Sequence, residues 1–191
     1  MFMKKFLLAV GLVFAAGLGL QAAPETYAID SVHSSVDFKI RHLGVSWVQG
    51  SFGKFEGKVV FDADKAEASS VEVTVQADSV DTRNDGRDKH LKSEDFFNTA
   101  KYPTLSFKST KVEKKAADTY EVTGDFTLLG VTKPLTFTMT TSGPVEGMKK
   151  ETRRGGETEF TIKRSDFGMS KMVGPIGDDV KISLAFSGVK Q

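Results

Sequence analysis

Hydrophobic and polar residues alternate along most of the chain beyond residue 24. In residues 36–43, written VDFKIRHL, one face carries Val36, Phe38, Ile40 and His42, and charged residues occupy the positions between them. A period of two is typical of a β-strand with one buried face, because successive side chains of a strand point to opposite sides.

Seven further runs show the same alternation. In each run, β-branched and aromatic residues alternate with Lys, Thr, Ser or Glu, and turn-forming segments separate one run from the next. The sequence therefore predicts an all-β domain of eight antiparallel strands. The seven further runs are residues 55–61, 71–77, 104–110, 119–128, 134–141, 158–164 and 180–188.

One segment, residues 82–103, is charged and lacks strand alternation. Its first part is compatible with a short helix. Ser93 is a candidate N-cap for a second turn, since Glu94 and Asp95 would then lie in the first turn, where the helix dipole favours acids. We expect a short helical crossover between the third and fourth strands, covering one end of the sheet.

Eight antiparallel strands can form a two-sheet sandwich or a closed barrel. Closure removes the free strand edges that promote aggregation, so a lipocalin-like barrel is favoured. An eight-stranded barrel has an interior just wide enough for side chains or for one slim ligand. Three glycines in and beside one strand, Gly50, Gly53 and Gly57, indicate a bulge or the close approach of another group.

The N-terminus has the three parts of a secretory signal peptide. Lys4 and Lys5 precede an apolar run over residues 6–20, and small residues follow it. The run is shorter than the twenty or so residues of a membrane span, although an uncleaved anchor is the alternative. We expect cleavage after Ala22, export to the periplasm of a Gram-negative bacterium, and a single domain over residues 23–191.

Composition and charge exclude several classes of function. Removing residues 1–22 removes two lysines and no acid, so the formal charge falls from +1 to −1. A chain so near neutrality is unsuited to binding nucleic acid without regard to sequence. The chain has no cysteine, which excludes disulfides and thiol catalysis. The sequence also predicts no stable insertion into a membrane.

The residue types that perform catalysis are present but not suitably spaced. His33, His42 and His90 lack the short spacing of a metal pair, and no serine lies in the glycine-flanked elbow of a hydrolase. We therefore expect no catalytic residue, no metal and no cofactor. Lys101 and Lys133 lie at turn ends, where a solvated lysine is the simpler interpretation than a contact with a ligand head group.

Phenylalanine is the stronger signal, because twelve remain once residues 1–22 are removed. Most fall on the apolar faces of the predicted strands, and an apolar tube with few polar groups suits an apolar ligand. His42 could hold the turn by hydrogen bonds or contact a head group, and Trp47 could close one end or simply pack. The predicted lining is Val36, Phe38, Ile40, His42, Trp47, Phe55, Val59, Phe61, Phe107, Phe126, Phe137, Phe160 and Phe186.

Several motifs resemble the YceI-like, lipocalin-like family of polyisoprenoid-binding proteins over residues 27–188. They include D-x-x-H-S at residues 30–34, H-L-G-x-S at 42–46, G-x-F-x-x-F-x-G at 50–57 and IKRSDFGMS at 162–170. The resemblance implies an extended antiparallel barrel with an apolar pore that holds an isoprenoid chain, with its head group near one mouth. It also implies the absence of catalytic apparatus. The loop VEGMKKETRRGG is the one variable part.

The leading hypothesis is periplasmic binding, transport or storage of a polyprenyl lipid, such as a quinone or its precursor. A tube of ten-residue strands is roughly 25 Å deep, so a long tail would fold or protrude, and a homodimer would bury a protruding tail. The alternatives are an enzyme acting on a lipid or small apolar substrate, with His42 as acid and base, and a structural or stress-response module with a solid core.

Overall fold

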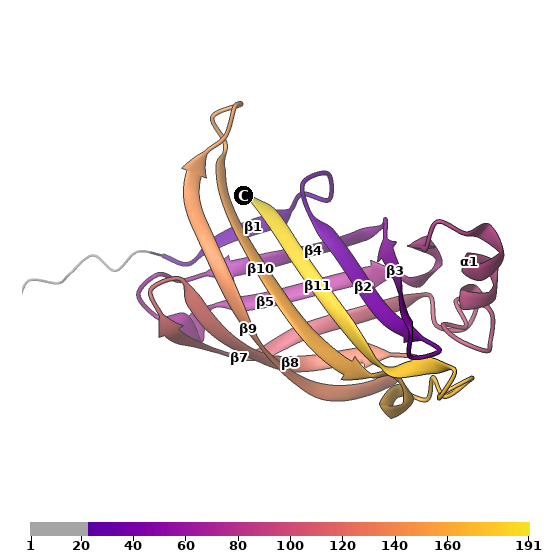
Figure 1. Cartoon of the computed structure of the whole chain (residues 1–191). Coiled ribbons are helices and arrows are strands. Elements are labelled where there is room, and N and C mark those ends of the chain that lie inside the picture. The colour runs from indigo at the N-terminus through magenta and orange to yellow at the C-terminus, as the bar shows by residue number, and fades with distance from the viewer. Residues whose placement is uncertain (1–22) are drawn as a thin grey trace, which may run out of the picture.

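The computed structural model describes residues 23–191, and the signal peptide predicted for residues 1–22 lies outside them (Figure 1). The described chain is almost entirely β-structure with one α-helix, α1, at Asp85–Lys92, and three short 3-10 turns. The strands are β1 (Glu25–Ile29), β2 (Ser35–His42), β3 (Ser46–Phe52), β4 (Phe55–Phe61), β5 (Ser70–Gln76), β6 (Val80–Asp81), β7 (Thr104–Ala116), β8 (Thr119–Leu128), β9 (Val131–Glu146), β10 (Thr152–Lys163) and β11 (Ile176–Lys190).

The first strand closes the sheet into a barrel. β1 pairs with β4, where Tyr27 lies opposite Val59, and with the end of β11, where Tyr27 lies opposite Lys190. The sheet order β1-β4-β5-β7-β8-β9-β10-β11, returning to β1, is a ring of eight antiparallel strands. The predicted eight-stranded antiparallel barrel is confirmed.

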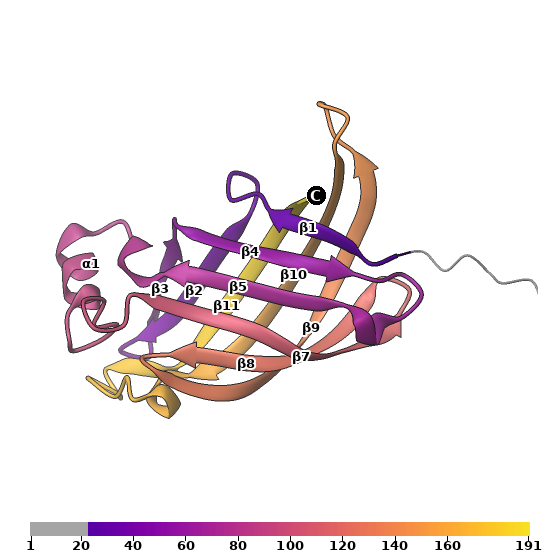
Figure 2. The ribbon, with the colours of Figure 1, turned by 180° about the vertical axis from the view of Figure 1, so that it is seen from behind.

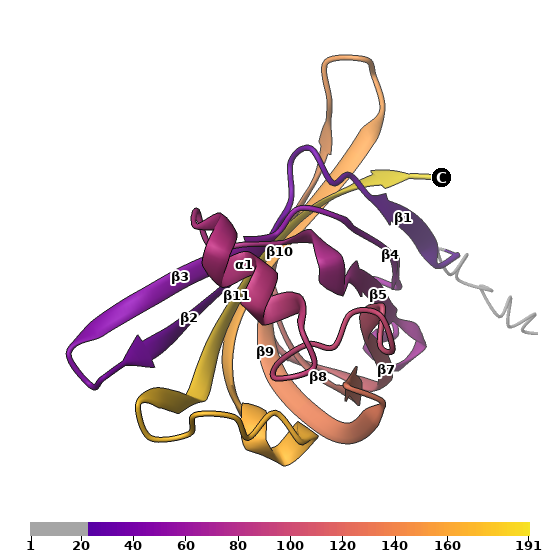
Figure 3. The ribbon, with the colours of Figure 1, turned by 90° about the vertical axis from the view of Figure 1, so that its right-hand side faces the viewer.

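Three ring strands are interrupted, which is why the structure has more strands than the eight alternating runs. β1 and β2 both pair with the long strand β11, one at each end, and the loop of residues 30–34 separates them. β3 likewise precedes β4, and β6 follows β5. The β2–β3 hairpin leaves the ring and projects from its wall (Figure 3). The alternation missed β1 and β6 because they are only five and two residues long, and it missed β3 because Gly50 interrupts the apolar face that Val48 and Phe52 share.

The helical crossover lies between β5 and β7, at one end of the barrel, as Figures 1 and 2 show from opposite sides. α1 begins after Asn84, whose side chain accepts a hydrogen bond from the Arg87 amide at 2.9 Å. The prediction that Ser93 caps a second helical turn is wrong. Ser93 is instead the C-cap of α1, and its hydroxyl donates to the His90 carbonyl at 2.7 Å.

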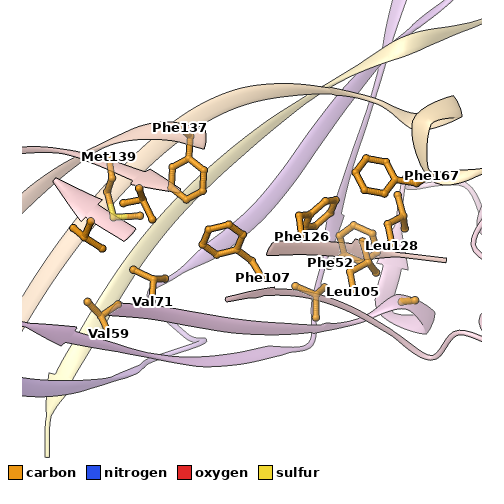
Figure 4. Close-up of a cluster of buried hydrophobic side chains, with 14 of the residues drawn as sticks. Phe52, Val59, Val71, Leu105, Phe107, Phe126, Leu128, Phe137, Met139 and Phe167 are labelled. Carbon is orange, nitrogen blue, oxygen red and sulfur yellow. The ribbon is translucent and has the colours of Figure 1, made fainter. Parts of the chain in front are cut away.

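The core is built from the inward positions of the strands and from the segment after α1. Phe96 is buried there, and Phe97 packs edge-on to Phe52 with ring centroids 5.6 Å apart. Figure 4 shows side chains from opposite walls meeting inside the barrel. The aromatic foot expected after Ser93 therefore joins the barrel core, although the segment that carries it is not helical.

Candidate functional site

The barrel encloses a cavity of about 630 Å³. This volume is within the range of small-molecule binding sites in proteins, which is about 300–1,000 Å³. Most of the wall is aliphatic or aromatic, and basic side chains gather at one end. The cavity is the feature of the structure best suited to hold a ligand.

The predicted lining residues fall into two groups in the structure. All but two border the cavity, and they come from β2, β4, β7, β8, β9, β10 and β11. Their role in binding a ligand stays a prediction. The residues that border the cavity are Val36, Phe38, Ile40, His42, Phe55, Val59, Phe107, Phe126, Phe137, Phe160 and Phe186.

Phe61 does not border the cavity, although Val59 on the same face of β4 does. The Phe61 ring packs edge-on to Tyr120 with centroids 5.7 Å apart, and the guanidinium of Arg154 lies 3.7 Å from the centre of the Phe61 ring. With Tyr27, which is fully buried, these side chains form a plug beyond the inner limit of the cavity. Alternation predicted the face of Phe61 correctly but not its depth along the barrel.

Trp47 also lies away from the cavity, so neither of its expected roles inside the barrel matches its place. It lies opposite Arg41 in the β2–β3 register, which puts it on the outer face of the hairpin. The Arg41 guanidinium carbon is 4.1 Å from the centre of the indole ring. The sequence alone does not give the register of the β2–β3 hairpin. With that register, the pairing of Trp47 with Arg41, an outward residue of β2, would have placed Trp47 on the outer face.

Strand glycines provide room for the phenylalanines of the wall. Gly50 lies opposite Phe38, and a Cβ at Gly50 would approach the Phe38 ring to 2.4 Å. Gly156 lies opposite Phe186, where a Cβ would be 2.5 Å from the ring. A glycine opposite an aromatic residue leaves room for the ring to lie flat over the neighbouring strand. The close approach expected at Gly50 is therefore to a phenylalanine of the protein itself.

The middle of the cavity wall carries a run of contacting rings. Phe107 and Phe137 have centroids 5.2 Å apart, and Phe137 stacks on Phe160 at 5.1 Å with an interplanar angle of 17°. These are favourable separations for aromatic pairs. Phe107 and Phe137 face each other between Met139 at the deep end and Phe126 toward the mouth (Figure 4). These rings offer no hydrogen-bonding group, so they suit a hydrocarbon.

Basic side chains border the cavity near its open end, which we call the mouth. Arg41 and His42 border it from β2, and Arg87 and His90 border it from α1. His42 is one of the predicted lining residues, whereas Arg87 is not. The Arg87 guanidinium is held by two hydrogen bonds, which its Nε and Nη2 donate to Thr82. The mouth can therefore receive a polar or anionic group, and the interior can hold an apolar chain attached to it.

A loop at residues 168–175, the mouth loop, is held by the buried side chain of Arg164. Its guanidinium donates to the carbonyls of Met169, Lys171, Ile176 and Gly177 at 2.8–3.2 Å. Burial of the guanidinium lowers the pKa of Arg164, and the nearby charge of Asp178 only partly opposes this effect. No carboxylate of residues 23–191 lies within ion-pair distance of the guanidinium. Backbone carbonyls therefore satisfy the N–H groups of this buried guanidinium.

An ion pair spans the mouth. Asp95, after α1, accepts from His90 at 2.9 Å, and the Lys171 ammonium of the mouth loop lies 3.2 Å from its other oxygen. The hydrogen bond from His90, followed by that from Lys171, lowers the pKa of Asp95. The pair links the helical crossover to the mouth loop from opposite sides.

The three histidines do not converge. His33 pairs with Asp30 in the β1–β2 loop, and His90 pairs with Asp95 at the mouth. The His42 ring has no hydrogen-bond partner in the described chain, so the interpretation that it holds the turn is not supported. No group of three or more His, Asp or Glu side chains in residues 23–191 could hold a metal ion.

The two lysines at turn ends lie away from the cavity. Lys101 lies over the Tyr102 ring at 5.2 Å, and neither Lys101 nor Lys133 borders the cavity. Within residues 23–191, no helix has the length and apolar character needed to cross a bilayer.

Comparison with known proteins gives the chain its family. A model of the YceI-like domain matches residues 27–187. A UPF0312 protein of Ectopseudomonas mendocina is 42% identical over 99% of this chain and 100% of its own length. Protein YceI of Escherichia coli is 43% identical, again over 99% of this chain and 100% of its own length.

Solved structures share the fold. The Campylobacter jejuni YceI protein has a TM-score of 0.72 and 30% sequence identity, and the match covers 99% of both chains. A polyisoprenoid binding domain from Saccharophagus degradans has a TM-score of 0.69 at 16% identity, covering 86% of this chain and 98% of its own. The motifs, the barrel and these matches agree, and the chain belongs to the YceI-like family.

Proposed function

We propose that this protein binds an isoprenoid lipid in the barrel cavity and carries or stores it in the periplasm. The observation that supports the proposal is the cavity of about 630 Å³, walled mainly by Phe, Val, Ile and Leu side chains and bordered by basic groups at its mouth. The Saccharophagus degradans domain of similar fold is a polyisoprenoid binding domain. At 16% identity the two proteins share a fold, and the apolar cavity wall of this chain itself supports a hydrocarbon ligand.

The energetics favour a hydrocarbon tail over a polar ligand. Burying a methylene group contributes about 0.8 kcal/mol, so a prenyl tail gains affinity from contact area without any ion pair. Part of that gain offsets the freedom that the tail loses on binding. A polar ligand would lose its hydrogen bonds to water on entering the cavity. The side chains of Phe107, Phe137 and Phe160 offer no hydrogen-bonding group to replace them.

The polar end of the lipid would lie at the mouth. Arg87 is already positioned there by Thr82, and His42 lies on the β2 side of the opening. This arrangement supports a lipid with an acidic or hydrogen-bonding head group. The proposal involves no metal or cofactor.

The periplasmic location is supported by the sequence of residues 1–22, with its two lysines, apolar run and small-residue end. Enzymatic turnover with His42 as acid and base has less support, because no carboxylate lies within ion-pair distance of its ring in residues 23–191. A solid core has less support than a carrier, because the cavity is large.

Mass spectrometry of the mature protein, purified from periplasm without detergent, tests the proposal. We expect a stoichiometric species that is released only on denaturation and has a mass that fits repeated five-carbon units. That mass would also identify the head group. A protein that remains free of lipid after incubation with polyprenyl lipid would contradict the proposal.

A pair of neighbouring substitutions in β11 localises the binding. Ile182 borders the cavity, whereas the next residue, Ser183, does not, and its hydroxyl donates to Glu159 at 3.2 Å. We expect Ile182→Lys to abolish lipid retention and Ser183→Lys to leave it unchanged, with both variants still giving the far-UV circular dichroism of a β-protein. Equal retention by the two variants would show that the lipid does not bind inside the barrel.

A further inference from the structure

Large apolar side chains are exposed at one edge of the mouth. Leu43 and Val45, in the β2–β3 turn, are 60% and 80% exposed, and Met172 and Val173, in the mouth loop, are 46% and 45% exposed. We call these four residues the apolar rim. Clusters of exposed apolar side chains commonly mark an interaction surface.

The two halves of the apolar rim are joined. The Leu43 amide donates to the Pro175 carbonyl at 2.7 Å, and Ile176 lies opposite His42 in the β2–β11 register. Met172 and Ile176 also border the cavity. Figure 3 shows the hairpin tip and the mouth loop side by side at the same end of the barrel as α1. The rim is therefore part of the opening through which a ligand would pass.

A cluster of positive charge lies directly beside the rim, on the outer face of β2, β3 and β11. The Trp47 ring is approached by Arg41 at 4.1 Å, Lys181 at 5.4 Å and Lys39 at 5.9 Å. We call these three cations and Trp47 the cation cluster. An exposed indole surrounded by cations resembles the belt residues that membrane proteins place at the level of the lipid head groups.

The cation cluster carries an electrostatic cost that the described chain does not offset. Lys39 and Lys181 lie directly opposite each other in the β2–β11 register, and like charges at such positions are destabilising. None of the three cations forms an ion pair with an acid of residues 23–191, and Asp37, two positions before Lys39, forms none either. The cluster is therefore complementary to an anionic partner.

We propose that the apolar rim and the cation cluster dock the protein on an anionic lipid bilayer, with the cavity mouth facing the membrane. The rim would enter the interfacial region, Trp47 would lie at head-group level, and the cations would pair with lipid phosphates. Docking would give a lipid a short path between bilayer and cavity. That purpose depends on the proposed function, whereas the docking itself depends only on the surface.

A second copy of the chain fits this surface less well. A two-fold interface uses the same patch on both copies, so it would bring two sets of Lys39, Arg41 and Lys181 together. The exposed side chains of Val145 and Met148 are not an equivalent surface, because the β9–β10 hairpin precedes β10 whereas the mouth loop follows it, at the other end of that strand. That hairpin provides a matched control.

The fluorescence of Trp47 tests the proposal, because it is the one tryptophan of the chain. We expect its emission to shift to the blue, and the protein to co-float, with vesicles of phosphatidylcholine and phosphatidylglycerol. Vesicles of phosphatidylcholine alone should produce neither effect, and added salt should weaken both. The combined variant Lys39→Gln, Lys181→Gln, whose two positions do not border the cavity, should bind the anionic vesicles about twenty-five-fold more weakly. The loss of each cation near such a surface weakens binding roughly fivefold.

Two further variants separate the apolar and the control surfaces. Leu43→Asn with Val45→Ser should also weaken co-flotation, and asparagine tolerates the positive φ of 52° at position 43. Val145→Ser with Met148→Ser should leave co-flotation unchanged. Equal binding of wild type to neutral and anionic vesicles would overturn the proposal, as would unchanged binding by the cation variant. A blue shift that appears without vesicles and grows with protein concentration would show that the surface binds a second copy of the chain. That result would also overturn the docking proposal.

Lipid occupancy, measured by native mass spectrometry on the same variants, separates this proposal from the carrier function. We expect the cation variant to keep its bound lipid and lose docking. A protein that holds lipid but never docks would overturn docking alone. A protein that docks but never holds lipid would overturn the carrier function and leave docking supported.

Discussion

The two ends of the barrel use arginine in different ways. We call the end beyond the plug of Phe61, Tyr27 and Tyr120 the closed end. There Arg154 is buried over the Phe61 ring, and aromatic packing with Tyr27 and Tyr120 fills the interior. At the mouth Arg164 is also buried, but it binds four backbone carbonyls around an exposed loop. The closed end is therefore stabilised by packing and the mouth by hydrogen bonds. A barrel built this way can keep its shape at one end while the other remains open to a ligand.

The largest effect is expected at the closed end. Phe61→Ala removes a buried ring that contacts Tyr120 and Arg154, so we expect a loss of about 3–5 kcal/mol in the free energy of unfolding. Lipid occupancy should persist, since Phe61 does not border the cavity. Urea unfolding and mass spectrometry measure the two quantities. Loss of lipid without loss of stability would show that the plug belongs to the binding site.

A smaller effect is expected at the mouth. Arg164→Met removes the hydrogen bonds that hold the mouth loop, and we expect a loss of about 2–3 kcal/mol, because the freed carbonyls of this exposed loop can turn to water. Hydrogen exchange should rise at residues 169–176 and stay unchanged in β1 and β4. Arg164→Lys should recover only part of the loss, because an ammonium cannot reproduce the guanidinium geometry. Uniformly faster exchange throughout the barrel would contradict the division between its ends.

Gly156→Ala probes the wall between the two ends. The added methyl would lie 2.5 Å from the Phe186 ring, so the ring must move, and overpacking of this kind costs about 1–3 kcal/mol. We expect a lower urea midpoint and reduced lipid occupancy. Gly53→Ala is the control, because a Cβ there meets nothing within 4 Å. If the two variants have the same urea midpoint and the same lipid occupancy, Gly156 does not provide the room that the Phe186 ring needs.

The smallest effect concerns an ion-pair network that joins the β1–β2 loop to the start of β10. Hydrogen bonds from Arg153 and then His33 lower the pKa of Asp30. A carboxyl with a lowered folded-state pKa stabilises the fold above its ordinary pKa of about 4, and the contribution is lost as the pH falls below that value. We expect Asp30→Asn to flatten the decline of the urea midpoint between neutral and acid pH.

Lipid occupancy of Asp30→Asn should match that of wild type at neutral pH, because Asp30 does not border the cavity. Identical pH dependence of the urea midpoint in wild type and variant would show that Asp30 contributes nothing to acid sensitivity.

Sequence reasoning succeeded where the signal is local. The alternation around Phe38, Phe107 and Phe137 predicted which side chains face inward, because a strand's period of two is independent of what surrounds it. It failed for Trp47, since a residue next to a turn needs the hairpin register to assign its face. It failed for Ser93, because a serine before acids can precede a helix or end one, and the hydrogen bonds of α1 decide between the two.

The sequence by itself determined an all-β chain, the count of its principal strands and most of the apolar wall. Only the tertiary structure decided how deep each inward residue lies, so that Val59 borders the cavity while Phe61 closes the barrel beyond it. It also brought Arg164 to the carbonyls of the mouth loop and Lys181 beside Lys39. Alternation is a property of neighbours along one strand, whereas depth and charge clustering arise from the stagger between strands and the pairing of distant segments.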